Sequence, residues 1–217
     1  MIVPETEAWG LSMIVGDCRV FAIESGITEA TESLSQLALG FFVVYVGGRA
    51  FGVRRPDASM LACSFNEVER RLGRRGTHVS PIPPEVPAPE VAAAYLDAFY
   101  RDDARIDYFG LSHQQFVDGL LANGSIWAPD GDEAFDDGSH ILQFDMGDRV
   151  RIIAFLNTQA PDDFAQTICE EWMNADLFYA IVSGWKTLFA MERTGLLEAK
   201  ATRSPAVGRW LLEPKEE

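Results

Sequence analysis

The most restrictive feature of the sequence is an unbroken run of β-branched and aromatic residues at 40–46, GFFVVYV. Such a run is typical of a central strand whose two faces are both covered. Gly47 and Gly48 follow it, and a second apolar segment, residues 49–53, comes next. Two glycines between apolar runs predict a two-residue hairpin turn, because this turn needs positive φ at both positions. The chain therefore has to cover both sides of a hairpin at about residues 40–53.

A second hairpin is predicted at about residues 140–156, with strands at 140–146 and 149–156 joined by Gly147 and Asp148. Glycine at the first position of a two-residue turn favours type II′. Apolar residues alternate along the second strand, which predicts one buried face. They are Val150, Ile152, Ala154 and Leu156.

Helical spacing of apolar residues predicts five helices. The first begins with a capping box between Ser64 and Glu67 and ends near Gly73 or Gly76. The others are marked by Val91, Tyr95 and Phe99; by a Ser112 cap with Phe116, Leu120 and Leu121 facing inward; by Pro161 with a stripe of Phe164, Ile168 and Trp172; and by residues 175–194 with Gly195 as the stop. In the last helix, Phe178, Ile181, Trp185, Leu188 and Phe189 form the predicted buried face.

The order of these elements predicts an α+β fold with an antiparallel or mixed sheet, built from the two hairpins and packed by helices. We expect a single compact domain over residues 13–212. Residues 1–12 read as an N-terminal extension, with Met13 as an alternative start. Residues 79–90 contain five prolines and are interpreted as an extended connector. Residues 213–217 are charged and interpreted as a frayed tail.

The formal net charge of −15 limits the partners of the chain. Non-specific nucleic-acid binding and an acidic membrane surface are disfavoured, whereas a basic protein partner is favoured. The longest apolar run, residues 38–48, is too short to cross a bilayer as a helix. With no signal peptide pattern at the N-terminus, the sequence predicts a cytoplasmic protein. The three cysteines are widely spaced and form no CxxC pair, so we expect reduced thiols.

Motifs for catalysis are missing from the sequence. The three histidines are dispersed, and HExxH, GxSxG and P-loop patterns are absent. An EF-hand pattern starting at Asp130 fails, because Ala134 and Ile141 stand where ligands are required. We therefore expect no enzyme activity, cofactor or metal. The alternative is a small enzyme or ligand-binding domain whose pocket has no sequence signature.

Charge is unevenly distributed along the chain. Residues 49–75 contain seven arginines and three acids, whereas residues 97–148 contain twelve acids and two arginines. Loops on a rigid scaffold are common binding surfaces, and clustered carboxylates attract a basic partner. We therefore expect the acidic loop to contribute to partner binding. Its residues are Asp130, Asp132, Glu133, Asp136 and Asp137. In the alternative, the arginines of residues 49–75 neutralise this loop within the fold.

Several short segments in this order resemble a known family. They are MIVGD at 13–17, FAIE at 21–24, YVGG at 45–48 with FG at 51–52, LACSF at 61–65, and the hairpin segments DDGS at 136–139, LQFD at 142–145 and VRIIAF at 150–155. Together they resemble immunity protein family 42 of bacterial polymorphic toxin systems, over most of residues 13–194. The resemblance implies a cytoplasmic antitoxin that binds a cognate toxin domain and blocks it by stoichiometric protein–protein inhibition. The toxin, the interface and any homo-oligomer are left open.

Overall fold

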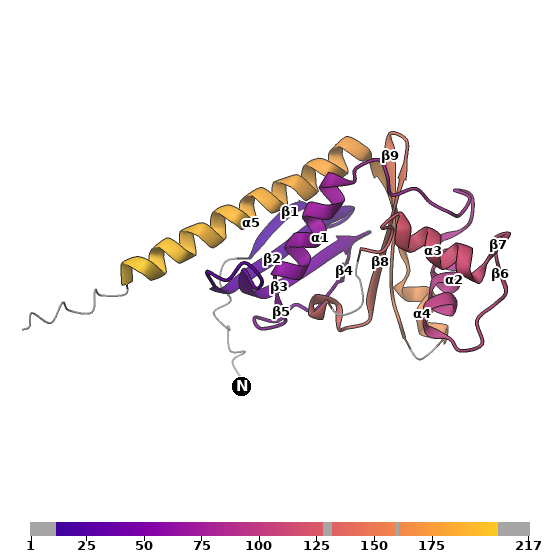
Figure 1. Cartoon of the computed structure of the whole chain (residues 1–217), viewed down its shortest axis with the longest axis horizontal. Helices are drawn as coiled ribbons and strands as arrows, with labels where there is room; N and C mark the ends of the chain where they lie inside the picture. Colours follow the sequence, from indigo (N-terminus) through magenta and orange to yellow (C-terminus); the bar gives the residue numbers. More distant parts are fainter. Residues whose placement is uncertain (1–11, 128–131, 159–160, 204–217) are drawn as a thin grey trace, which may run out of the picture.

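The computed structural model describes residues 12–127, 132–158 and 161–203 (Figure 1). Its first sheet is antiparallel, with strand order β1-β2-β3-β4 and β5 also paired to β3. The strands are β1 (Met13–Asp17), β2 (Phe21–Ala30), β3 (Ala38–Val46), β4 (Arg49–Phe51) and β5 (Ser59–Met60). Residues 1–11 and 213–217, expected to be an extension and a tail, lie outside the described residues.

The second sheet is also antiparallel, with strand order β10-β9-β8. It is formed by β8 (Ser139–Met146), β9 (Arg149–Leu156) and β10 (Cys169–Asn174). A small separate pair, β6 (Asp107–Tyr108) and β7 (Leu111–Ser112), precedes it in the chain. The expected α+β class and the single compact domain are confirmed, and the sheets are antiparallel rather than mixed.

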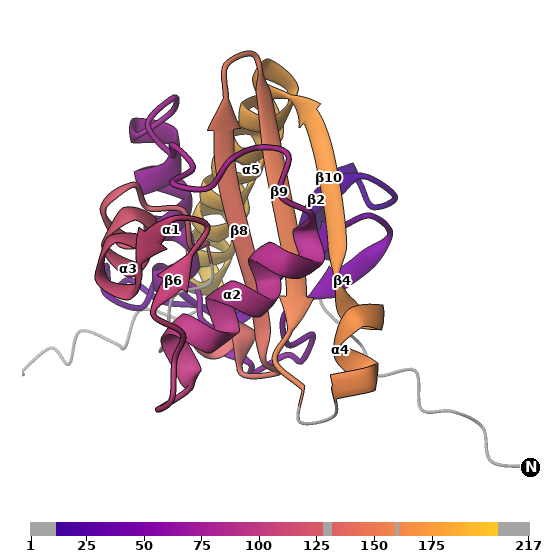
Figure 2. The ribbon, with the colours of Figure 1, turned by 90° about the vertical axis from the view of Figure 1, so that its right-hand side faces the viewer.

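Helices cover the two sheets from different sides. They are α1 (Ala62–Gly73), α2 (Ala88–Tyr100), α3 (His113–Ala122), α4 (Pro161–Thr167) and α5 (Ala175–Arg203), with a 3₁₀ turn η1 (Glu133–Phe135). The long helix α5 lies along β1 and β2, with α1 beside it (Figure 1). Figure 2 shows α2 crossing the opposite side of the second sheet, with α3 and α4 at its flanks.

Strand β9 separates two hydrophobic cores. Val150, Ile152 and Ala154 pack into the first core, which contains the first sheet and the inner side of α5. Ile153 and Phe155 pack into the second core, beneath α2 and α3. The alternation predicted a single buried face, but helices cover both sides of this strand. The second sheet therefore lies between the two cores and contributes side chains to both.

Both predicted hairpin turns are confirmed. Gly47 and Gly48 have φ values of 58° and 85°, as a type I′ turn requires. At the second turn Gly147 has a φ of 68°, whereas Asp148 is not in the positive region, which fits type II′. The predicted cap of α3 is present too, because the Ser112 side chain accepts a hydrogen bond from the backbone N–H of Gln115.

The predicted capping box at Ser64 is wrong. Helix α1 begins two residues earlier, at Ala62, with Leu61 as an N-cap that makes no side-chain hydrogen bond. The Ser64 hydroxyl instead donates to Asp132, and Glu67 pairs with arginines of its own helix. Long-range partners have therefore replaced the local cap.

Two further boundaries differ from the prediction. The helix from Pro161 ends at Thr167, and the chain then forms β10, which pairs with β9 and places Trp172 opposite Arg151. Trp172 is therefore a half-buried strand residue rather than part of a helical core stripe. Helix α5 also continues past Gly195 to Arg203. Among the residues expected to be buried, Leu121 and Leu188 are exposed.

The proline-rich connector is held against the second sheet. The buried Arg151 side chain donates to the carbonyl oxygens of Pro84 and Val86, at 3.2 and 2.7 Å. Ile82 of the same segment is buried in the second core. Residues 88–90 already belong to α2. Of the helices in the described ranges, none has the length and apolar character needed to cross a membrane.

Candidate partner-binding site

The described part of the acidic loop is fixed to the fold by Asp132. Its side chain is only 5 % exposed. One carboxylate oxygen accepts a hydrogen bond from the Ala134 N–H at 3.0 Å, and the other accepts from the Ser64 hydroxyl at 3.3 Å. Burial raises the pKa of this carboxyl group above its ordinary value. Asp132 therefore ties the loop to the first turn of α1 rather than facing a partner.

A second carboxylate, Asp137, connects the loop to both hairpins. It accepts hydrogen bonds from the backbone N–H groups of Ser139, at 3.0 Å, and Gly52, at 3.2 Å. Gly52 has a φ of +117°, and a Cβ there would lie 2.8 Å from the Phe42 carbonyl oxygen. The absence of a side chain at Gly52 thus allows the loop and the first sheet to approach closely. Asp137 remains exposed while making these contacts.

Glu133 and Asp136 are the loop residues with exposed side chains for which no structural hydrogen bond is seen within the described ranges. They stand at the start and just after the end of η1. Asp130 lies outside the described residues. The structure thus separates the four described carboxylates by role, with Asp132 buried, Asp137 exposed but hydrogen-bonded, and Glu133 and Asp136 exposed.

Four of the seven arginines that could have neutralised the loop, Arg54, Arg70, Arg71 and Arg75, make ion pairs with other acids. Arg54 pairs with Glu24 at 2.8 Å, on the first sheet. Arg75 pairs with Asp176 at the start of α5. The ion pairs seen for these arginines in the described ranges therefore do not support the internal-neutralisation alternative.

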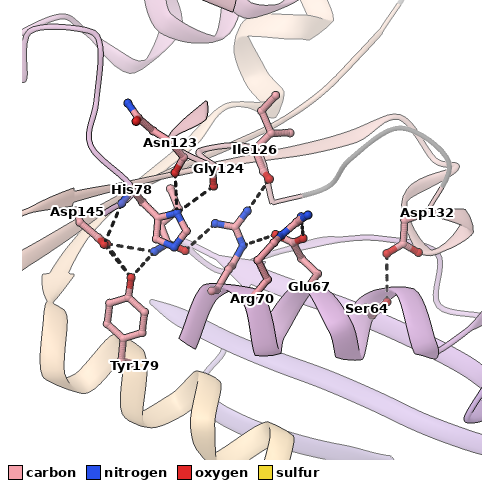
Figure 3. Close-up of polar contacts among 12 residues, drawn as sticks. Ser64, Glu67, Arg70, His78, Asn123, Gly124, Ile126, Asp132, Asp145 and Tyr179 are labelled. Atoms are coloured by element: carbon pink, nitrogen blue, oxygen red, sulfur yellow. Dashed lines mark hydrogen bonds and ion pairs between the residues drawn. The ribbon is translucent and has the colours of Figure 1, made fainter. Parts of the chain in front are cut away.

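A buried polar network, which the sequence did not predict, joins α1 to the second sheet (Figure 3). Its centre is Arg71, whose side chain is fully buried. The guanidinium donates to the Gln143 side-chain oxygen at 3.0 Å and to the Ile126 carbonyl oxygen at 2.5 Å. It also pairs with Glu67 at 2.8 Å and lies 4.6 Å from the Trp127 ring centre. Burial lowers the pKa of Arg71 to about 9, so the group still carries its charge at neutral pH.

The network continues along β8 to α5. The Gln143 amide donates to the Tyr179 hydroxyl at 2.9 Å and to Asp145 at 3.1 Å. The Tyr179 hydroxyl donates to Asp145 at 2.9 Å, and Asp145 also accepts from the Gly76 N–H at 2.7 Å. Burial, followed by the charge of Asp145, raises the pKa of Tyr179. Because these groups satisfy one another inside the fold, we interpret the network as structural.

The position of Arg71 could have been read from the sequence. Residues 64, 68 and 71 share one face of a helix, and Ser64, Val68 and Arg71 are all buried. A solvated face is the usual environment of an arginine-rich helical segment, because arginine is rarely fully buried. Glu67, one turn before Arg71, could have indicated that Arg71 is buried, because a buried arginine requires an acidic or polar partner.

A hollow of about 290 Å³ lies beside this network, where α1, α2 and the end of α3 meet. Arg70 and Arg74 of α1 stand at its edge, and Phe99 and Leu120 are among its apolar lining residues. His78 lies behind it and places its Nδ1 atom 3.0 Å from the carbonyl oxygens of both Asn123 and Gly124. Since both neighbours are acceptors, Nδ1 carries the proton of the neutral ring. No group of three or more metal-ligating side chains occurs within the described ranges.

The exposed carboxylates of the acidic loop stand on a loop held by the scaffold, where binding residues are commonly found. The family model described as Immunity protein 42 matches residues 13–188, and the chain belongs to this family. It is therefore an immunity protein, the antitoxin of a bacterial toxin system, which binds and neutralises its cognate toxin. The resemblance noted from the sequence is confirmed.

Other comparisons add little to this assignment. A solved structure described as CdiI from Burkholderia dolosa AUO158 aligns with a TM-score of 0.48 and 18% sequence identity. The alignment covers 79% of this chain and 97% of that chain. A comparison with curated proteins gives no significant match.

Proposed function

We propose that the chain inhibits its toxin stoichiometrically and without catalysis, in the cytoplasm, and that the acidic loop forms part of the toxin-binding face. The role proposed for the loop rests on the different environments of its carboxylates. Asp132 and Asp137 fix the backbone through four hydrogen bonds. Glu133 and Asp136 are left to face solvent on a rigid support. Pre-ordered charges of this kind lose little entropy on binding.

The net charge of the chain supports a basic toxin. A formal charge of −15 attracts a cationic partner over distances up to about the Debye length, roughly 8 Å at physiological salt. Charges at the edge of an interface act mainly on the association rate. We therefore expect Glu133 and Asp136 to accelerate encounter with the toxin rather than to slow dissociation.

The test uses the toxin domain encoded beside the gene for this chain. The double variant Glu133→Gln, Asp136→Asn should associate more slowly than the unchanged protein, and added salt should reduce this difference. Asp132→Asn is the control, because it removes a loop charge from a buried position, whereas the double variant removes two exposed charges. It should associate faster than the double variant, because an asparagine can still accept from the Ala134 N–H and donate to the Ser64 hydroxyl and so keep the loop in place.

An association rate that is the same for the double variant and the unchanged protein at low salt would refute the role of the loop. Stoichiometry is tested separately by titrating the activity of the toxin with the immunity protein. We expect inhibition to be complete at one equivalent. Progressive inactivation of excess toxin would instead show a catalytic antitoxin.

A further inference from the structure

The hollow between α1, α2 and α3 combines an apolar lining with two cationic side chains. Arg70 is in the last turn of α1 and Arg74 is the C-cap of this helix, with its N–H bonded to the Arg70 carbonyl oxygen, so both stand on the same side of the hollow. Phe99 and Ile126 are half-buried in its lining, and Leu121 is 55% exposed at its edge. Its volume of about 290 Å³ is at the lower limit of ligand pockets and suits one large side chain.

The charge at this hollow is opposite to that of the whole chain. Glu67 lies between Arg70 and the buried Arg71, so this trio has an excess of one positive charge. Within the described ranges Arg74 makes no ion pair, and its guanidinium donates a hydrogen bond to the Ala122 carbonyl oxygen at 2.6 Å. A guanidinium has five N–H donors, so most of those of Arg74 remain available for an acceptor.

Gly124 leaves room for the Arg74 side chain at the edge of the hollow. Its φ of +59° is in the left-handed region, and a Cβ at this position would lie 2.8 Å from an Nη atom of Arg74. The Gly124 carbonyl oxygen also accepts a hydrogen bond from His78. The backbone that borders the hollow is thus held by His78 and lies directly against the half-buried Arg74.

We propose that this hollow is a second anchor for the toxin and accepts an apolar side chain with an adjacent carboxylate. The apolar group would enter between Phe99 and Leu121, and the carboxylate would pair with Arg74. An arginine beside an aromatic pocket is the usual composition of an interface position that contributes strongly to affinity. The inference rests on the proposed function, because the partner is the same toxin.

The hollow and the acidic loop are close enough for one interface. Ser64, which binds Asp132 of the loop, is ten residues from Arg74, the C-cap of α1. With a rise of 1.5 Å per residue, the two positions are roughly 15 Å apart. Figure 3 shows Asp132 near one end of α1 and Arg70 with Gly124 towards the other. A standard interface of about 800 Å² per partner spans such a distance.

The first experiment needs no toxin and uses phenylacetate as the probe. In an NMR titration, phenylacetate should shift the Arg74 side-chain N–H and the Gly124 amide signals, whereas the uncharged phenylacetamide should shift them much less. The variant Arg74→Gln should remove the difference between the two compounds. Equal shifts from both compounds, or shifts located elsewhere on the protein, would overturn the proposal.

The second experiment measures dissociation of the adjacent-gene toxin domain from the variant Leu121→Asp. A negative charge at the edge of the hollow should repel the carboxylate and speed dissociation by roughly tenfold or more. Leu177→Asp is the matched control, because Leu177 is also 55% exposed but lies on α5, outside the hollow. It should leave dissociation unchanged.

The two arms separate the failure of this inference from that of the loop proposal. If Leu121→Asp dissociates like the control, the hollow is not an anchor, whatever the effect of Glu133→Gln, Asp136→Asn on association. If Leu121→Asp dissociates faster while the loop variant associates normally, the hollow is an anchor and the role proposed for the loop is wrong.

Discussion

At the scale of single residues, Arg71 shows how a charge is accommodated inside this protein. Its guanidinium contacts a carboxylate, an amide oxygen, a backbone carbonyl oxygen and an aromatic ring. Removing one partner of such a group leaves a buried charge without compensation, which usually costs about 3–5 kcal/mol. The contact with Gln143 also joins α1 to β8, so the Arg71 side chain connects this helix to the second sheet.

His78 gives the fold a dependence on pH that can be measured. Burial, followed by the positive charge of Arg71, lowers the pKa of its ring below the ordinary value of 6.5, while Asp145 acts weakly in the opposite direction. Below about pH 6.5 the unfolded chain takes up a proton at this position that the folded protein does not. His78 therefore makes the protein more stable above pH 6.5 than below it, because protonation of this residue in the unfolded chain lowers the free energy of unfolding as the pH falls.

We expect the variant His78→Asn to lose less stability than the unchanged protein between pH 7 and pH 5. The asparagine amide can replace the Nδ1 donor to the carbonyl oxygens of Asn123 and Gly124, but it does not titrate. Urea unfolding at both pH values measures the difference. The carboxyl groups are shared by both proteins and cancel in this comparison. Equal losses would show that His78 titrates normally in the folded state.

At the scale of elements, local patterns predicted the two hairpins and the cap of α3, because their turns and caps depend on neighbouring residues. Strand β10 was missed, because Phe164, Ile168 and Trp172 also fit helical spacing. What decides its structure is pairing with β9, where Trp172 stacks near Arg151 at 5.3 Å. The burial of Asp132 was missed for a similar reason, since its partner Ser64 is distant in the sequence.

Gly195 provides a test of the corrected end of α5. This glycine has helical backbone angles, and a Cβ there would meet no atom within 4 Å. Alanine has the higher helix propensity, so Gly195→Ala should stabilise the helix by about 0.5–1 kcal/mol. Amide hydrogen exchange at residues 196–200 should slow accordingly. Faster exchange, as expected if a glycine with positive φ ended the helix here, would contradict the described course of α5.

At the scale of the whole molecule, the two cores share β9 and are therefore expected to unfold together. Ile152 lies in the first core, and its neighbour Ile153 lies in the second. The connector between α1 and α2 is held by Arg151 of the same strand. These contacts leave neither layer with a complete hydrophobic core of its own.

We expect the methyl NMR signals of Ile152 and Ile153 to disappear at the same urea concentration. The two residues are adjacent in the chain, so a difference between their signals would report on the two cores and not on different parts of the sequence. Limited proteolysis within residues 79–90 should likewise release no stable half. Separate unfolding midpoints, or a protease-resistant fragment that begins at α2, would show two independent units.

The double role of β9 also limits how the length of this chain changes during evolution. Successive side chains of a strand point to opposite faces, so deleting one residue exchanges the two faces beyond that point. In β9 such a deletion would direct Arg151 towards the first core or Ile152 towards the second. Substitutions affect one core at a time, whereas a single insertion or deletion here disrupts both. Relatives of this protein are therefore expected to differ in length at their loops and to keep the eight positions of Arg149–Leu156 without gaps.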